Sequence, residues 1–206
     1  MLSRYFVLLI RETMITKSNR LVTLYLENNP NPNSLKFVAN FMLVGEGENY
    51  DFPDEASAEH APLAKELFNY AFVKRVFYMN NFVTITKDEN VEWIDIQDQL
   101  KTHIREYLEA EKPVLIKADP LQNDILDSDP DVVKNIKSVL EEYIKPAVES
   151  DGGAIVFQDF EDGVVKVALQ GSCSGCPSSM VTLKAGIENL LKRMVPEVQS
   201  VEAVSL

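Results

Sequence analysis

The chain contains only two cysteines, Cys173 and Cys176, which lie three positions apart in a sequence of 206 residues. One such pair cannot form the disulfide framework that stabilises small secreted domains. The fold therefore depends on apolar cores, and 46% apolar residues are enough for one large domain or two small ones. We expect the protein to work in a reducing compartment.

The composition argues against two classes of partner. The net charge is −12 and the isoelectric point is near 4.6, whereas nucleic acids and anionic membrane surfaces are bound by clustered lysines and arginines. No apolar run reaches the roughly 18–20 residues that span a bilayer. We therefore expect neither a nucleic acid nor a membrane as a partner.

The first half of the chain has the pattern of an α+β unit. Alternating apolar and polar residues predict strands, and Asn80-Asn81 predicts a hairpin between the last two. The expected strands are 20–27, 34–40, 73–79 and 82–86. Apolar residues at helical spacing predict helices over 61–70 and 93–108, and the acidic stretch 45–57 is expected to be irregular.

The second half predicts the order helix, strand, strand, cysteine loop, helix, strand. A first helix begins at Ser128-Asp129-Pro130, with a polar N-cap and proline at the first helical position. Pro146 should kink or loosen its last turn, and Asp151-Gly152-Gly153 should end it. The remaining expected elements are strands 154–160, 164–170 and 198–204 and a helix from about residue 178.

These patterns predict an α+β fold of two small domains. Residues 16–110 form the first domain and residues 129–206 form the second. Residues 111–128 are rich in proline and charge, as expected for a linker. Residues 1–15 are expected to be a leader or a disordered start.

The start of the chain bears on localisation. Residues 1–13 are basic and apolar up to Glu12, and Met14 is a second possible start just before the first patterned strand. We expect a cytoplasmic protein. The alternative is the mitochondrial matrix, if residues 1–13 are a transit segment.

The cysteine pair lies in the run Gly171-Ser172-Cys173-Ser174-Gly175-Cys176-Pro177, between a strand and a helix. Amides at a helix N-terminus favour the thiolate, and glycines allow amides to approach sulfur closely. A four-thiolate metal site needs twice as many cysteines as this chain supplies. The missing ligands must come from a second chain or from a small molecule.

Four interpretations of this pair remain open on the residues alone. They are an iron–sulfur cluster shared by two chains, zinc held in the same way, a thioredoxin-like dithiol, and two small apolar residues in a turn. The thioredoxin interpretation is weakened because few residues follow the pair, whereas that fold continues well beyond it. Ligand count does not exclude zinc.

The cysteine run, the preceding Asp151-Gly152-Gly153 and the helix that follows resemble the C-terminal domain of the NifU/Nfu-type iron–sulfur scaffolds. Residues 29–37, 62–68 and 82–87, with Trp93, are similar to the N-terminal domain of Nfu proteins. The resemblance implies a scaffold and carrier that binds a [4Fe–4S] cluster through Cys173 and Cys176. The cluster would be shared across a homodimer and transferred to apo-proteins.

The same resemblance implies that the protein is not an enzyme, and the sequence contains no Gly-x-Gly-x-x-Gly run and nothing that resembles a catalytic triad. Its implied partners are a second copy of the chain, apo iron–sulfur acceptors and an upstream cluster donor. A dithiol oxidoreductase and a zinc-bridged structural dimer are the alternatives. The choice between [4Fe–4S] and [2Fe–2S] in the resting form stays open.

Overall fold

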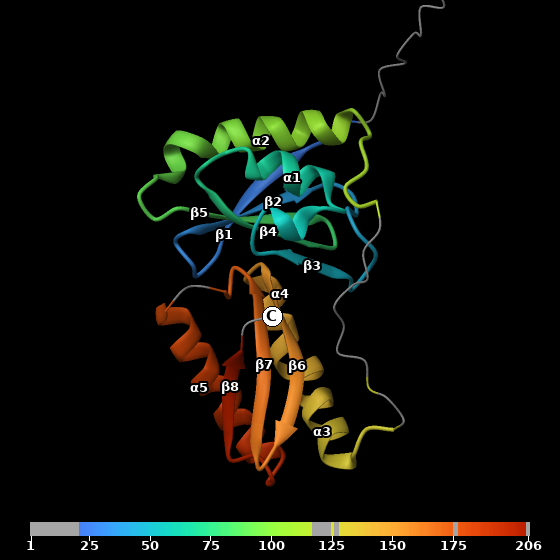
Figure 1. The fold of residues 1–206 in the computed structure, drawn as a ribbon, viewed down its shortest axis with the longest axis vertical. Helices are drawn as coiled ribbons and strands as arrows, with labels where there is room; N and C mark the ends of the chain where they lie inside the picture. Colours follow the sequence, from blue (N-terminus) through green and yellow to red (C-terminus); the bar gives the residue numbers. More distant parts are fainter. Residues whose placement is uncertain (1–20, 117–124, 126–127, 175–176, 205–206) are drawn as a thin grey trace, which may run out of the picture.

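The structure is a computed structural model that describes residues 21–116, 125, 128–174 and 177–204, with side chains described for the same residues except 177–180. It confirms the predicted α+β class. The described residues form a five-stranded sheet in the order β1-β2-β5-β4-β3 and a three-stranded sheet in the order β6-β7-β8 (Figure 1).

All neighbouring strands of the first sheet are antiparallel. The strands are β1 (Leu24–Asn28), β2 (Ser34–Ala39), β3 (Asn49–Phe52), β4 (Val73–Met79) and β5 (Phe82–Lys87). The helical segments are the 3-10 turn η1 (Ala56–Ala58), α1 (Pro62–Phe68) and α2 (Trp93–Glu109). The hairpin predicted at Asn80-Asn81 joins β4 to β5, and Asn80 has the positive φ of 47° that such turns favour.

Helices α1 and α2 cover one face of the first sheet (Figure 1). Alternate residues of each strand, such as Val83 and Ile85 of β5, pack beneath these helices with Leu67, Leu100 and Ile104. This core is built entirely from residues between Val22 and Leu115, so the first unit closes its core without help from the second half.

The second sheet combines an antiparallel hairpin with a parallel third strand. Its strands are β6 (Gly153–Glu161), β7 (Val164–Gly171) and β8 (Ser200–Val204). The helical segments are α3 (Asp131–Val139), η2 (Leu140–Ile144), α4 (Lys145–Ser150) and α5 (Pro177–Met194). Helix α5 is the crossover that makes β8 parallel to β7, and its Ile187 and Leu191 are fully buried.

The helix is disturbed near Pro146, but not in its last turn as the sequence predicted. Residues Leu140–Ile144, which end two positions before the proline, form a π-helical turn between α3 and α4, and the last segment, α4, is regular α-helix. Because proline lacks an N–H and clashes with the preceding turn, the helix widens there instead of continuing as regular α-helix.

Two sequence predictions were wrong in detail. The stretch 45–57 was expected to be irregular, but it contains β3, in which Tyr50 and Phe52 are buried against the first core. Four residues are too few for the alternation to stand out in an acidic context. The helix after Asp129 begins at Asp131, with Pro130 as its N-cap, and no side chain caps it by a hydrogen bond.

The domain boundaries stay a prediction. Residues 1–15 and most of the linker at 111–128 lie outside the described residues. No helix in the described part of the chain is long and apolar enough to span a membrane.

The second face of the first sheet is also covered, by the β6–β7 end of the second unit (Figure 1). We call this surface the docking face; it consists of Lys36, Val38, Asp51, Phe77, Met79, Phe82 and Thr84. Its apolar members form a small buried cluster with Ala154 of β6. An antiparallel sheet can leave one face in water, but here both faces are buried.

Candidate thiol site

Cys173 lies in a tight turn directly after β7. The Cys173 amide donates to the Gln170 carbonyl at 3.3 Å, and the Ser174 amide donates to the Gly171 carbonyl at 3.2 Å. The hydroxyl of Ser174 donates to the Leu169 carbonyl, which ties the turn back to the strand. This local network holds the backbone of the turn that carries the thiol.

The Cys173 side chain is 7% exposed and packs at the edge of the second core. A β-carbon built on Gly153 would lie 2.9 Å from the Cys173 sulfur and 2.5 Å from the Gln170 carbonyl oxygen. Gly153 is therefore required by the close approach of the sulfur to the β6 backbone, and not only as the helix stop that the sequence predicted.

Gly171 has a positive φ of 60°, a conformation that favours glycine. A β-carbon there would lie 2.9 Å from the Phe77 ring of β4. The residue before the cysteine turn is therefore in direct contact with the docking face.

The first unit binds the cysteine turn through specific hydrogen bonds. The Asn31 amide nitrogen donates to the Ser172 carbonyl at 2.9 Å, and the Gly171 amide makes a longer contact of 3.4 Å with Asp51. The Thr84 hydroxyl donates to the carbonyl of Gly152, the residue before β6, at 2.9 Å. These first-half residues were not predicted as site residues, because nothing local in their sequence reveals a partner more than sixty positions away.

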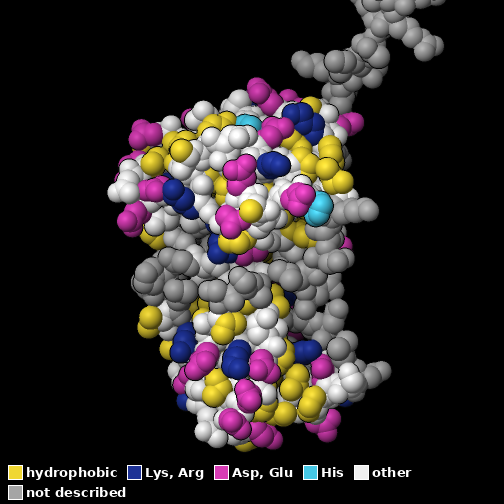
Figure 2. Space-filling model, viewed as in Figure 1, with side chains coloured by type: hydrophobic (Ala, Val, Ile, Leu, Met, Phe, Trp, Pro, Cys, Tyr) yellow, Lys and Arg dark blue, Asp and Glu magenta, His cyan; other side chains and the backbone are white. Residues whose placement is uncertain are grey.

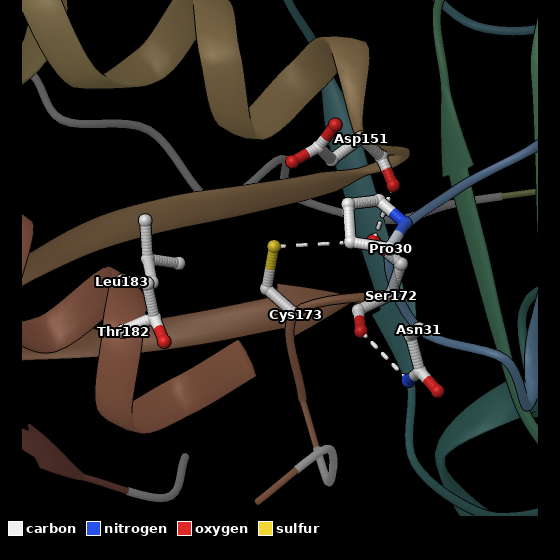
Figure 3. A pocket seen from close by; sticks show the side chains of 7 residues that line it. All are labelled: Pro30, Asn31, Asp151, Ser172, Cys173, Thr182 and Leu183. Carbon is white, nitrogen blue, oxygen red and sulfur yellow. Dashed lines mark hydrogen bonds between the residues drawn. The ribbon is translucent and has the colours of Figure 1, made fainter. Parts of the chain in front are cut away.

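Cys173 faces a pocket of about 420 Å³ between the two units. Pro30 and Asn31 form one wall, and Asp151, Ser172, Thr182 and Leu183 form the rest. The dashed line at the Cys173 sulfur in Figure 3 marks its 3.9 Å contact with the Ser172 hydroxyl. The thiol thus lies in a pocket that both units line.

The second predicted ligand, Cys176, lies outside the described residues. Helix α5 begins directly after it, at Pro177, one position before the start near residue 178 that the sequence predicted, and proline is favoured at a first helical position. Among the described residues, no group of three or more histidine, cysteine, aspartate or glutamate side chains is placed to hold a metal ion.

The charged groups near the turn are strongly affected by burial. Burial raises the pKa of Asp51 from 3.8 to about 6, although the Arg75 guanidinium and the Gly171 amide act in the opposite direction. Burial also raises the pKa of Asp151, and Lys36 opposes that change. On the face of the molecule in Figure 2, acidic and basic side chains are intermixed.

We expect the buried Asp51 to make the stability of the full chain depend on pH. A carboxyl with a raised pKa in the folded state favours folding when protonated, so this contribution is lost as the pH rises from about 4 to about 6. The loss is at most about 3 kcal/mol. In urea titrations at several pH values, Asp51→Asn should remove this part of the pH dependence, whereas Asp98→Asn, at an exposed position of α2, should keep it. Identical profiles for wild type and Asp51→Asn would contradict the assignment.

Two small α+β units, one of which presents a thiol turn between a β-hairpin and a helix, define a class of two-domain proteins that carry a cysteine-loop site. The chain belongs to the Nfu/NifU family of scaffold proteins. The family model described as the NifU-like domain matches residues 136–202, and the model described as the scaffold protein Nfu/NifU N terminal matches residues 24–111.

Curated relatives agree with this membership. The chain is 43% identical over 198 residues to the NFU1 iron-sulfur cluster scaffold homolog, mitochondrial, of Drosophila persimilis, and 44% identical over 197 residues to that of Drosophila yakuba. Each match covers 95% of this chain and 70% of the relative. A solution structure of a NifU-like protein from Saccharomyces cerevisiae is 28% identical, with a TM-score of 0.44, over 49% of this chain and 90% of that one.

Proposed function

We propose that this chain is an iron–sulfur cluster scaffold and carrier that binds a [4Fe–4S] cluster through Cys173 and Cys176. The cluster is shared by two copies of the chain and is transferred to apo-proteins. The observation that carries the proposal is the two-thiol loop between β7 and α5 in a chain whose relatives are named iron–sulfur cluster scaffolds.

The ligand count supports sharing between chains. A [4Fe–4S] cluster needs four protein thiolates, and each chain supplies two. Cys173 packs at the edge of the second core, but it also lines a pocket, so its sulfur lies beside a space that a cluster could enter.

Transfer follows from ligand exchange. A thiolate of the acceptor forms a new iron–sulfur bond as the bond to Cys173 or Cys176 breaks, and the released thiolate takes up a proton. A cluster at a seam between two chains can be released when the chains separate. The cluster is therefore cargo, and the protein needs no turnover chemistry of its own.

The names of the relatives also bear on the partners of this chain and on its subcellular localisation. We propose apo iron–sulfur proteins as acceptors and a separate upstream donor. The relatives are named mitochondrial, which favours the matrix over the cytoplasm that we expected from the sequence. Residues 1–13, on which a transit segment depends, lie outside the described residues.

The test is purification of the full chain without oxygen, followed by reconstitution with iron and sulfide. We expect a brown protein with broad visible absorption, half a [4Fe–4S] cluster per chain, and a dimer by light scattering. A colourless dimer that contains zinc would support the structural zinc module. A colourless protein with a reversible disulfide would support the oxidoreductase. A full cluster on a strict monomer, without added small thiols, would contradict sharing.

A further inference from the structure

The contacts around Cys173 bear on how a second chain can reach it. In the structure, which we call the closed arrangement, the N-terminal unit makes hydrogen bonds to Gly171, Ser172 and Gly152. Pro30 and Asn31 wall the pocket into which the thiol opens (Figure 3). A shared cluster requires the cysteine loop of a second chain to come within one cluster's width of this thiol. Pro30 and Asn31 line the same pocket as Cys173, so in this arrangement they take up space beside the thiol that a second loop would need.

We propose that the docking face is a binding surface for the chain's own Cys173 turn, and that it competes with a second copy of the chain for that turn. The closed chain is the monomeric form without cargo, and the open chain is the form that builds the bridged cluster. This inference rests on the proposed function, because it takes the second copy to be the partner of the open turn.

Specific polar contacts hold the closed form. In addition to the bonds from Asn31 and Thr84, the Lys36 ammonium donates to the Ser150 carbonyl at the end of α4, at 3.2 Å. A cation at a helix C-terminus is favourable because it meets the negative end of the helix dipole. Each contact pairs a side chain of the first unit with a backbone carbonyl of the second. Asn31 bonds the cysteine turn itself, at Ser172, whereas Thr84 and Lys36 of the docking face bond Gly152 and Ser150, which lead into β6.

The apolar part of the interface is small. It consists of five buried residues, of which Val38, Phe77, Met79 and Phe82 lie on the docking face and Ala154 lies on β6. The first core, in contrast, contains more than twenty buried residues. The two units therefore depend on their own cores for folding, and the interface between them can separate without unfolding either core.

Two buried polar groups favour opening. Gln170 lies opposite Ala154 in the β6–β7 ladder, so its side chain shares the face that meets the docking face. It is fully buried, and its amide oxygen and nitrogen have no hydrogen-bond partner in the described part of the chain. Opening would hydrate this amide, and it would also hydrate Asp51. Specific contacts thus stabilise the closed form, but burial of the Gln170 amide and of Asp51 destabilises it, because both groups would be hydrated on opening.

The closed form should weaken the binding of a second copy by an amount that depends on how many chains are open. A second copy binds only chains whose turn is released, so its apparent affinity is reduced by the fraction of open chains. Any change that weakens the docking face should raise both the accessibility of Cys173 and the rate of cluster assembly.

The experiment uses the full chain with Cys176→Ser, so that Cys173 is the only thiol. Alkylation of Cys173 by iodoacetamide is followed by mass spectrometry. Met79→Lys places a charge in the buried interface cluster, whereas Ile94→Lys places the same charge at a position of α2 that is 78% exposed. We expect alkylation to accelerate at least about tenfold in Met79→Lys and to stay unchanged in Ile94→Lys.

Thr84→Val is the milder second variant, in case Met79→Lys fails to fold as judged by circular dichroism. It has nearly the same shape, but it removes the hydroxyl donor that the first unit supplies to the Gly152 carbonyl, which then keeps only the 3.2 Å bond from the Ser172 amide. We expect alkylation to accelerate about fivefold or more. Unchanged alkylation in folded Thr84→Val and folded Met79→Lys would overturn the proposal.

The same substitutions in the chain with both cysteines test the competition. Met79→Lys should take up iron and sulfide and dimerise faster than wild type and than Ile94→Lys. Faster alkylation without faster assembly would overturn competition with a second copy. If no variant takes up iron under any condition, the proposed function fails, and the alkylation rates still decide whether the docking face covers Cys173.

Discussion

Replacing either Cys173 or Cys176 by serine is expected to leave a folded chain that is nearly devoid of iron. In a shared site each single substitution removes two of the four thiolates of the dimer, because both chains carry it. A serine hydroxyl is a hard ligand that stays protonated near neutral pH, so it binds iron poorly. Iron and sulfide content after reconstitution, and transfer to an apo-acceptor, should both fall at least about tenfold.

An equal loss of iron in the two cysteine variants would distinguish a scaffold from a dithiol oxidoreductase. In a dithiol oxidoreductase the attacking cysteine would be essential, whereas loss of the resolving cysteine would trap mixed disulfides with substrate. Unequal variants, with trapped disulfides in only one of them and no iron in the wild type, would reject the scaffold interpretation. Circular dichroism of both variants, with unchanged helix and strand content, shows that the loss is not a folding defect.

Replacing Gly153 by alanine is expected to destabilise the C-terminal unit and to displace the thiol. The new β-carbon would lie 2.5 Å from the Gln170 carbonyl oxygen and 2.9 Å from the Cys173 sulfur. Since the nearer of these is backbone, the strand itself must move, and overpacking of this kind costs about 1–3 kcal/mol. Urea denaturation should show this loss in the free energy of unfolding, and reconstitution should show slower cluster assembly.

Gly186→Ala is the matched control for this substitution. Gly186 lies within α5, and a β-carbon there would meet nothing within 4 Å. Alanine in a helix interior is favoured over glycine by about 0.5–1 kcal/mol, so this variant should be slightly more stable than wild type. If Gly153→Ala were as stable as Gly186→Ala, the close approach of sulfur to β6 would not exist in solution.

The sequence predicted most of the regular structure because the signals were local. Strand β4 and the Asn80-Asn81 hairpin were predicted nearly to the residue, since a turn signal lay between two apolar runs. An irregular helix at Pro146 was predicted from the missing N–H of proline, but neither its position before the proline nor its π-helical form was. Strand β3 was missed because it is short and its partner β4 is more than twenty residues away.

The site could be predicted only in part. Cys173 and Cys176 were apparent from their spacing, but the bonds from Asn31 and Thr84 to the cysteine turn depend on tertiary structure. One signal was available. The consecutive apolar residues Phe77-Tyr78-Met79 point to both faces of β4, which is typical of a strand that is buried on both sides. That pattern indicated a second covering layer, but not its identity.

Each of the two main cores comes from one uninterrupted stretch of chain. The first unit can therefore fold during synthesis before the second unit has been made. Domains fold as units during synthesis, beginning with the N-terminal one. The first core is complete in sequence by Leu115, whereas Cys173 is added almost sixty residues later. A newly made chain therefore already carries the finished docking face when Cys173 emerges, and the turn that holds this thiol can dock as soon as the second unit folds.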